Sequence, residues 1–278
     1  MHKFVCFNQQ IISAGDAFLS AVSSAALYGK GIFTTIAIYD SEPFRWEKHR
    51  QRLNENSQKI KLDISEFSAE TIKEALAELI EKNQIKDARA RITIFDESSG
   101  NIWKTEKVGK SNFLIQTADF RSVKESVRLT VSPFRVNSTS PLANVKSCNY
   151  LENILALENA QAENFDEAVR LNEKGEIVSA CMANIFWTKN NSIFTPCVET
   201  GCLEGTTRSF ILENFPVNER RANLPEVQQA DEIFLTSAGI GIVKAAGLNE
   251  KTLSGDSVIE IKDFFEKAKT QNKKRHET

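Results

Sequence analysis

Residues 141–208 read PLANVKSCNYLENILALENAQAENFDEAVRLNEKGEIVSACMANIFWTKNNSIFTPCVETGCLEGTTR. The stretch places one lysine, Lys146, between a loop and a predicted helix. Apolar residues recur from there at helical spacing, at Leu151, Ile154, Leu155 and Leu157. A cation just ahead of a helix opposes the helix dipole, and it is poorly solvated if the helix packs inward. Both effects lower the pKa of the lysine toward the range that a nucleophilic amine needs.

The rest of this stretch predicts two hairpins and a second helix. Alternating residues flank Lys174-Gly175 and Asn190-Asn191, which predicts hairpins over residues 167–179 and 183–195. The run LEGTTR, residues 203–208, then opens a helix. A glycine followed by two hydroxyl residues at a helix start directs N–H groups and side-chain donors at one point, which suits a phosphate group. Taken singly, these features also describe a surface lysine and an ordinary capped helix.

The first half of the chain alternates strands and helices. Strands are predicted over residues 4–11, 32–39, 88–95 and 113–117, and helices over residues 46–60 and 68–81, with Ser68 as the cap of the second helix. We therefore expect a small α/β domain over residues 1–121 and a larger domain over residues 122–278. An amphipathic helix over residues 258–268 is expected to close the second domain.

Composition excludes several classes of function. The net charge of −2 gives no basic field for nucleic acid or a membrane surface, and no apolar run approaches the length of a membrane span. The five cysteines form no CxxC pair, and the three histidines form no cluster, so neither a disulfide framework, a metal site nor a Ser-His-Asp mechanism is expected. The N-terminus lacks the pattern of a signal peptide. We predict a soluble, cytoplasmic protein.

Several motifs in a fixed order resemble the class IV aminotransferases, which are fold-type IV enzymes that use pyridoxal 5′-phosphate (PLP). They are YGKGIFTT at 28–35, HRQRL at 49–53, KSCN at 146–149, the segment from Gly175 to Asn184, Thr195-Pro196, LEGTTR at 203–208 and Thr236-Ser237. Each motif is weak alone, but their order and spacing together are specific. The resemblance implies an α/β (α+β) fold with a small α/β domain and a larger pseudo-barrel domain, and a homodimer.

The resemblance also implies roles for individual residues. Lys146 would be the catalytic residue and would carry the cofactor, and Arg52 would pair with its phosphate because a guanidinium directs two donors at a dianion. The other cofactor-binding residues would be Ser179, Leu203, Gly205, Thr206, Thr207, Thr236 and Ser237. A small-molecule amino substrate would contact Tyr28, Thr34 and Arg91, with Arg91 holding its carboxylate. On their own, Arg52 and Arg91 are equally consistent with solvated surface positions.

Ser179 departs from the family pattern and bears on the reaction. It stands where the family has a glutamate on the pyridine nitrogen, and a neutral hydroxyl stabilises a carbanion on the cofactor less than a carboxylate does. An elimination, which passes the charge to a leaving group, tolerates this change better than a transamination. Three likenesses within the family also bear on the reaction. Thr34 stands where many aminotransferases have a glutamate, and Asn149, three residues after Lys146, resembles the lyases and the D-amino acid transaminases. The run TSAGIGIV at 236–243 is similar to the lyases.

The sequence therefore favours a PLP-dependent lyase that converts 4-amino-4-deoxychorismate to 4-aminobenzoate and pyruvate, a step of folate biosynthesis. One alternative is an aminotransferase of branched-chain or D-amino acids. The other is a catalytically degenerate binding protein, which the change at Ser179 also fits. Lys30, where the family commonly has an aspartate, leaves the identity of the substrate open.

Overall fold

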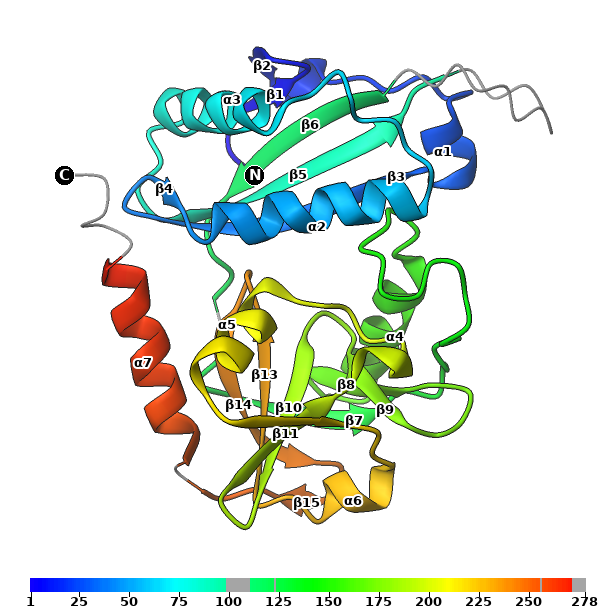
Figure 1. Ribbon diagram of the computed structural model, residues 1–278, viewed down its shortest axis with the longest axis vertical. Coiled ribbons are helices and arrows are strands. Elements are labelled where there is room, and N and C mark those ends of the chain that lie inside the picture. The colour runs from blue at the N-terminus through cyan, green and yellow to red at the C-terminus, as the bar shows by residue number, and fades with distance from the viewer. Residues whose placement is uncertain (99–110, 123, 256, 272–278) are drawn as a thin grey trace. The chain divides into compact units, whose positions relative to one another are not determined.

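The computed structural model describes residues 1–98, 111–122, 124–255 and 257–271, which form two compact units (Figure 1). Unit 1 contains residues 1–120, residues 145–149 and the end of the last helix from Lys269. Unit 2 contains residues 121–144 and 150–268. The lysine segment 145–149, which we predicted within the second domain, therefore belongs to unit 1.

Unit 1 is built on a six-stranded sheet in the order β2-β1-β6-β5-β3-β4, and every neighbouring pair is antiparallel. The strands are β1 (Phe4–Phe7), β2 (Gln10–Ser13), β3 (Gly31–Tyr39), β4 (Glu42–Pro43), β5 (Ala88–Asp96) and β6 (Ser111–Ala118). The helices are η1 (Ala14–Asp16), α1 (Ser24–Tyr28), α2 (Trp46–Lys59) and α3 (Ala69–Lys82).

Helices α2 and α3 pack on one face of this sheet (Figure 1). Alternate residues of the strands, such as Ile32 and Ile36 on β3 and Ile92 on β5, point toward the helices and are fully buried. Ser68 caps α3 as predicted, because its hydroxyl accepts the N–H of Thr71 at 3.0 Å. On the strands, the residues that alternate with these isoleucines, Arg91 among them, point to the opposite face of the sheet.

The predicted single strand over residues 4–11 is wrong, because the chain reverses within it. Asn8 and Gln9 both take positive φ angles, 46° and 67°, and they connect β1 to β2 in a tight hairpin. Asparagine is among the residues that adopt this conformation at low cost. Both flanking segments are apolar, so the sequence reads as one continuous strand.

Unit 2 is built on a larger mixed sheet in the order β12-β11-β10-β13-β14-β7-β8-β9, with β15 added on β14. The strands are β7 (Ser126–Val131), β8 (Glu167–Leu171), β9 (Ile177–Ala180), β10 (Asn184–Lys189), β11 (Ser192–Pro196), β12 (Val217–Arg220), β13 (Glu232–Ser237), β14 (Gly241–Leu248) and β15 (Lys251–Thr252). The helices are α4 (Leu151–Ala162), η2 (Val198–Thr200), α5 (Thr206–Asn214), α6 (Leu224–Gln228) and α7 (Ser257–Gln271).

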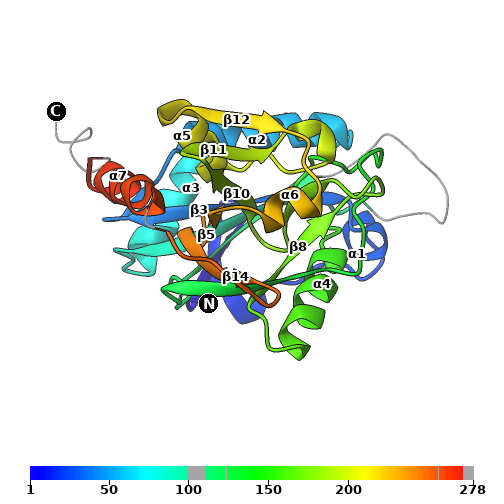
Figure 2. The same ribbon diagram turned by 90° about the horizontal axis from the view of Figure 1, so that it is seen from below.

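This second sheet curls back on itself, since β9 at one end of the order lies against β10 (Figure 2). Its interior is filled by alternate side chains of the strands, among them Val169, Ile185 and Leu235. Outside it, α4 buries Ala156 and Ala160 against β8. The mixed α/β architecture, with a curled sheet in the larger part, confirms the predicted fold.

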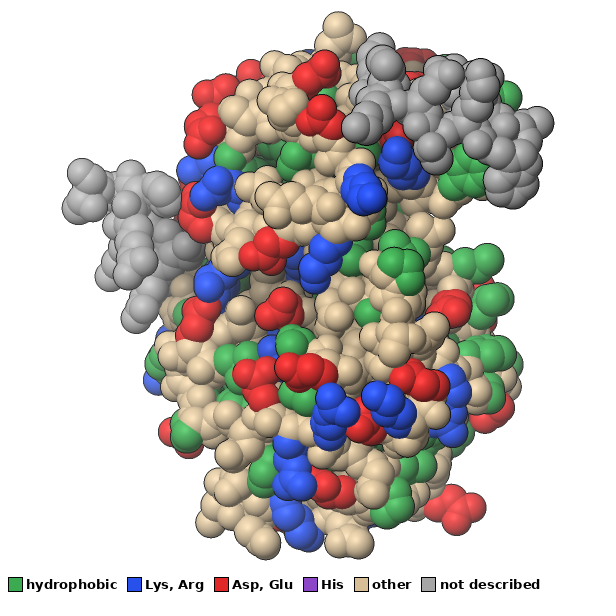
Figure 3. Space-filling view, turned by 45° about the vertical axis from the view of Figure 1, so that its right-hand side comes forward, with side chains coloured by type: hydrophobic (Ala, Val, Ile, Leu, Met, Phe, Trp, Pro, Cys, Tyr) green, Lys and Arg blue, Asp and Glu red, His purple; other side chains and the backbone are tan. Residues whose placement is uncertain are grey.

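The surface carries charges of both signs. Figure 3 shows lysine and arginine side chains interspersed with acidic ones over the face in view. Among the described residues, no helix combines the length and the apolar composition that crossing a membrane requires.

Candidate functional site

The segment that carries Lys146 is held on the edge of the unit 1 sheet. β4 covers only the C-terminal end of β3, so the other end of β3 can pair with another segment. There the N–H of Phe33 donates to the carbonyl of Lys146 at 2.9 Å, and the N–H of Cys148 donates to the carbonyl of Gly31 at 2.8 Å. The lysine backbone is thus fixed by a sheet, although the sequence around it shows no strand pattern.

The amine of Lys146 lies in cationic and aromatic surroundings. Its Nζ is 4.4 Å from the centre of the Phe33 ring, and the guanidinium carbon of Arg91 is 3.7 Å from the same ring. Burial lowers the pKa of Lys146 well below its usual 10.5, and the nearby charges of Arg52 and Arg91 lower it further. A larger fraction of this amine is therefore uncharged and nucleophilic at neutral pH than for a surface lysine.

Arg52, on α2, is buried and oriented by two neighbours. Its Nη2 donates to the hydroxyl oxygen of Thr34 at 2.5 Å, and that oxygen lies 2.7 Å from Nδ1 of His49. Because Thr34 accepts from Arg52, its own proton can be donated to His49 Nδ1. Burial lowers the pKa of His49 well below 6.5, with the charges of Arg52, Arg45 and Lys146 adding to the effect, so the ring is neutral and can accept.

This network makes the apoprotein sensitive to acid. The unfolded chain binds a proton at His49 below about pH 6.5 while the folded chain does not, so the free energy of unfolding falls as pH drops below that value. We expect His49→Asn, which keeps an acceptor atom for Thr34, to flatten this dependence, whose slope is up to about 1.4 kcal/mol per pH unit for one group. Urea unfolding of the apoprotein at several pH values measures it, with His2→Asn as the control. Equal slopes for wild type and His49→Asn would contradict this reading.

A pocket of about 290 Å³ adjoins Arg91 in unit 1. Its walls are mostly apolar, and its two charged side chains, Lys30 and Arg91, are both cationic. The other lining residues are Phe7, Ala17, Phe18, Leu19, Ala25, Thr93, Phe95, Leu114, Gln116 and Cys148. Lys30 pairs with the carboxylate of Asp96 at 2.7 Å. Tyr28 lies exposed at the end of α1, two residues from Lys30, and is not part of this lining. The pocket suits an apolar body that carries negative groups.

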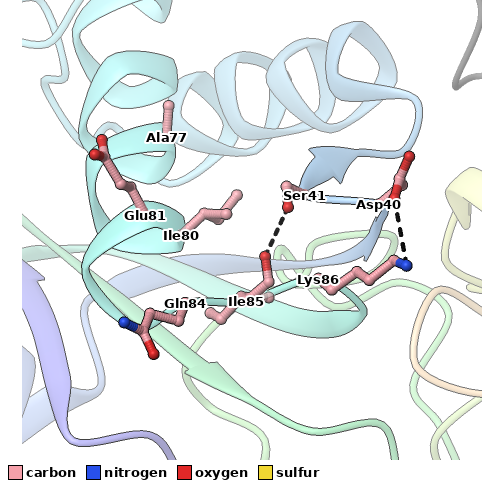
Figure 4. Close-up of a pocket in the computed structure, with 8 residues that line it drawn as sticks. All are labelled: Asp40, Ser41, Ala77, Ile80, Glu81, Gln84, Ile85 and Lys86. Carbon is pink, nitrogen blue, oxygen red and sulfur yellow. Dashed lines mark hydrogen bonds and ion pairs between the residues drawn. The ribbon is translucent and has the colours of Figure 1, made fainter.

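A second, broader hollow of about 530 Å³ lies at the other end of β3 (Figure 4). Some polar groups of its lining contact one another: the Ser41 hydroxyl donates to the backbone carbonyl of Ile85 at 2.8 Å, and Asp40 faces Lys86 at 4.0 Å. These contacts tie two loops together. We assign this hollow no chemical role.

In unit 2, a cradle forms where β10 and β13 meet the start of α5. Asn184 on β10 is the register partner of Thr236 on β13, and its Nδ2 donates to the carbonyl of Leu203 at 2.7 Å. Gly205 then caps α5 without a side-chain hydrogen bond, and a Cβ at this position would overlap Oδ1 of Asn184. Only glycine therefore allows this approach of the loop to β10.

The cradle presents donors to an anion. Thr206 and Thr207 form the first turn of α5, where backbone N–H groups lack helical partners. The hydroxyl of Thr236 is buried and has no hydrogen-bond partner within the described residues. A phosphate group would satisfy these donors, so the residues fit the phosphate of PLP.

The predicted site residues thus fall into two groups. Unit 1 brings together Lys146, Arg52, Thr34 and Arg91, and unit 2 brings together Leu203, Gly205, Thr206, Thr207 and Thr236. Thr34 is fully buried, and its hydroxyl orients Arg52 rather than facing the pocket. Ser237 lies beside Thr236 and accepts the N–H of Gly239 at 3.3 Å. Ser179 lies on β9, partly exposed, opposite Arg170 on β8.

Two residues of these groups were not predicted. His49 stands three residues before Arg52, so the two share one helix face, and this spacing was the available signal. Asn184 was noted only as the end of a motif, but its side chain positions Leu203 and Gly205. Among the described residues, no cluster of three or more histidine, cysteine or acidic side chains is arranged to hold a metal ion.

Comparisons with known proteins find relatives of one family and fold. The family model described as Amino-transferase class IV matches residues 31–247. The aminodeoxychorismate lyase of Bacillus subtilis (strain 168) is 29% identical over 94% of this chain and 92% of its own. The branched-chain aminotransferase of Thermoproteus uzoniensis with norvaline superposes with a TM-score of 0.89 at 25% identity, covering 96% of this chain and 94% of its own. The T.th. branched-chain aminotransferase with pyridoxamine 5′-phosphate shares the fold, with a TM-score of 0.90 at 20% identity and coverage of 100% and 97%.

Proposed function

The chain belongs to the class IV aminotransferase family, and from that premise we propose that it is a lyase that converts 4-amino-4-deoxychorismate to 4-aminobenzoate and pyruvate. It is a PLP enzyme of this family. The cofactor, when bound, withdraws electrons from the substrate carbon that bears the amino group. The remaining chemistry falls to side chains of this chain.

The observation that carries the proposal is the meeting of Lys146 and Arg91 on the ring of Phe33. A cation beside the base can hold a substrate carboxylate while the proton on the carbon that bears the amino group faces the amine of Lys146. The adjoining pocket is mostly apolar and its charged side chains are cationic, which suits a cyclic substrate that carries carboxylates better than a small aliphatic amino acid. Relatives described as a lyase and as branched-chain aminotransferases are equally similar in sequence, so the choice rests on the pocket and on position 179.

In this proposal each residue has a defined task. Arg52, held by Thr34 and His49, is the phosphate-binding cation of unit 1, and the donors around Gly205 and Thr236 form the phosphate cradle of unit 2. The amine of Lys146 would hold the cofactor when no substrate is present, and it would serve as the base when the substrate is bound. Lys146 then removes the proton from the carbon that bears the amino group, the C–O bond to the enolpyruvyl group breaks, and the proton is returned to that leaving group, which gives pyruvate.

The side chain at position 179 favours the lyase over the aminotransferase. We assign Ser179 to the pyridine nitrogen of the cofactor, where a hydroxyl supplies one hydrogen bond and no charge. Reactions that leave negative charge on the cofactor lose more from this than an elimination does. The homodimer and the cytoplasmic location stay predictions.

Pyruvate release in the absence of an amino acceptor tests the proposal. With purified protein, PLP and 4-amino-4-deoxychorismate, we expect pyruvate and 4-aminobenzoate in equal amounts, and no acceleration on adding 2-oxoglutarate. An aminotransferase would instead consume branched-chain or D-amino acids only when a 2-oxo acid is present. A protein that binds PLP but gives neither reaction would overturn the proposed function.

A further inference from the structure

Ser179 has a buried arginine as its cross-strand neighbour. Arg170 on β8 and Ser179 on β9 are direct partners in the antiparallel register, so their side chains leave the sheet on the same face, with Cβ atoms about 5 Å apart. Arg170 is 2% exposed. The hydroxyl that we assign to the cofactor nitrogen therefore stands next to a fixed cation inside unit 2.

The partners of this guanidinium orient it without neutralising it in a buried ion pair. One terminal nitrogen donates to Oδ1 of Asn153 at 3.0 Å, and the other donates to Glu152 at 3.3 Å. The side chain of Glu152 is 73% exposed, so water screens its charge. The Nε of Arg170 is buried and has no hydrogen-bond partner among the described residues. Asn153 also donates to the carbonyl of Cys181 at 2.6 Å, which ties the first turn of α4 to the end of β9.

The acidic side chains around this hairpin are committed to other contacts. Glu167 is buried on β8, where its two carboxylate oxygens accept the N–H groups of Cys181 and Met182, each at 2.9 Å, and burial raises its pKa. Glu176 accepts from Asn172 and faces Arg221. The Cys181 thiol is neutral, because burial raises its pKa to about 12. None of these groups offers a carboxylate on the face that carries Ser179 and Arg170.

We propose that Arg170 and Ser179 act as a pair that keeps the ring nitrogen of PLP unprotonated. This rests on the proposed function, which assigns Ser179 to that nitrogen. A hydroxyl can donate a hydrogen bond to the nitrogen lone pair, and a cation nearby disfavours a second positive charge on the ring. Arg170 is then a positioning and tuning residue, acting on the cofactor through the electric field and through Ser179.

The pair sets which reactions the site favours. An unprotonated ring withdraws less electron density from the substrate carbon than a protonated ring does. Charge left on the ring is then poorly stabilised, while charge that passes at once to a leaving group is little affected. Arg170 and Ser179 thus select elimination over transamination, and restoring an acid at position 179 is expected to weaken that selection.

NMR of the protein reconstituted with PLP labelled with ¹⁵N at the ring nitrogen tests the pair. The chemical shift of that nitrogen is measured as a function of pH. In the wild type we expect the shift of an unprotonated pyridine at neutral pH. Ser179→Glu should give the protonated form at that pH. Arg170→Met should raise the pH midpoint of the transition by at least about one unit, a tenfold change in the protonation ratio.

Glu152→Gln provides a second variant that leaves the buried arginine in place. Removing this exposed carboxylate strengthens the field of Arg170, so the midpoint should move to lower pH, while Glu158→Gln farther along α4 should leave it unchanged. A protonated ring nitrogen in the wild type, or midpoints that do not move in the Arg170 and Glu152 variants, would overturn the inference. Failure of PLP to attach to Lys146 would instead overturn the proposed function, so the two outcomes are distinct.

Discussion

Replacing Lys146 with methionine is expected to lower pyruvate release by at least about 10²–10⁴-fold, because the variant keeps the aliphatic stem but has no amine to move the proton. The phosphate cradle of unit 2 is unchanged, so PLP should still bind without a covalent link. Steady-state pyruvate assays at saturating PLP measure the loss, and Lys73→Met, an exposed position on α3, serves as the control.

The same substitution is expected to stabilise the apoprotein at neutral pH. Between the lowered pKa of folded Lys146 and 10.5 the unfolded chain holds a proton that the folded chain lacks, so folding of the wild type is disfavoured in that window and recovers as pH rises. Lys146→Met removes this cost, and its advantage in urea unfolding should shrink toward pH 10. Two results would contradict the account. One is undiminished pyruvate release by Lys146→Met, and the other is a variant that is less stable than the wild type at pH 7 and more stable than it at pH 10.

Gly205→Ala is expected to disrupt the phosphate cradle. The new methyl group would overlap Oδ1 of Asn184. This side chain cannot rotate freely, because it is buried and its Nδ2 donates a hydrogen bond to the carbonyl of Leu203. The start of α5 must therefore shift. We expect a loss of about 1–3 kcal/mol in the free energy of unfolding and at least a tenfold loss of PLP affinity.

Fluorescence titration of the apoprotein with PLP and urea unfolding measure the two effects. Gly239→Ala is the matched control in unit 2, since its methyl group would meet the Ser237 hydroxyl only at an ordinary 3.8 Å. If Gly205→Ala bound PLP as tightly as Gly239→Ala, the cradle would not be the phosphate site.

Local sequence patterns predicted the regular elements well where one physical rule dominates. The helix over residues 68–81 and its Ser68 cap follow from apolar periodicity and hydrogen-bond chemistry, and both agree with the observed α3. The Lys174-Gly175 turn likewise connects two strands, and Gly175 takes a positive φ of 79°. The Asn8-Gln9 reversal was missed because a single asparagine without a glycine beside it is a weak turn signal between two apolar segments.

The site was predicted only as far as individual residues. Motif order identified Lys146, Arg52 and Gly205, but no local pattern indicates that the 146–148 segment pairs with the edge of β3. Nor does one indicate that His49 and Thr34 orient Arg52, or that Arg170 faces Ser179. These are contacts between segments distant in sequence, and they depend on sheet register and on the packing of α2, which the folded chain alone specifies.

The most direct test of the account is to find where PLP attaches. The purified protein is loaded with PLP, reduced with borohydride and digested, and the modified peptide is identified by mass spectrometry. We predict one reduced cofactor per chain, on Lys146, and none on this peptide in Lys146→Met. Modification of another lysine, such as Lys30 or Lys244, or no stable modification at all, would contradict the assignment of this chain as a PLP enzyme built around Lys146.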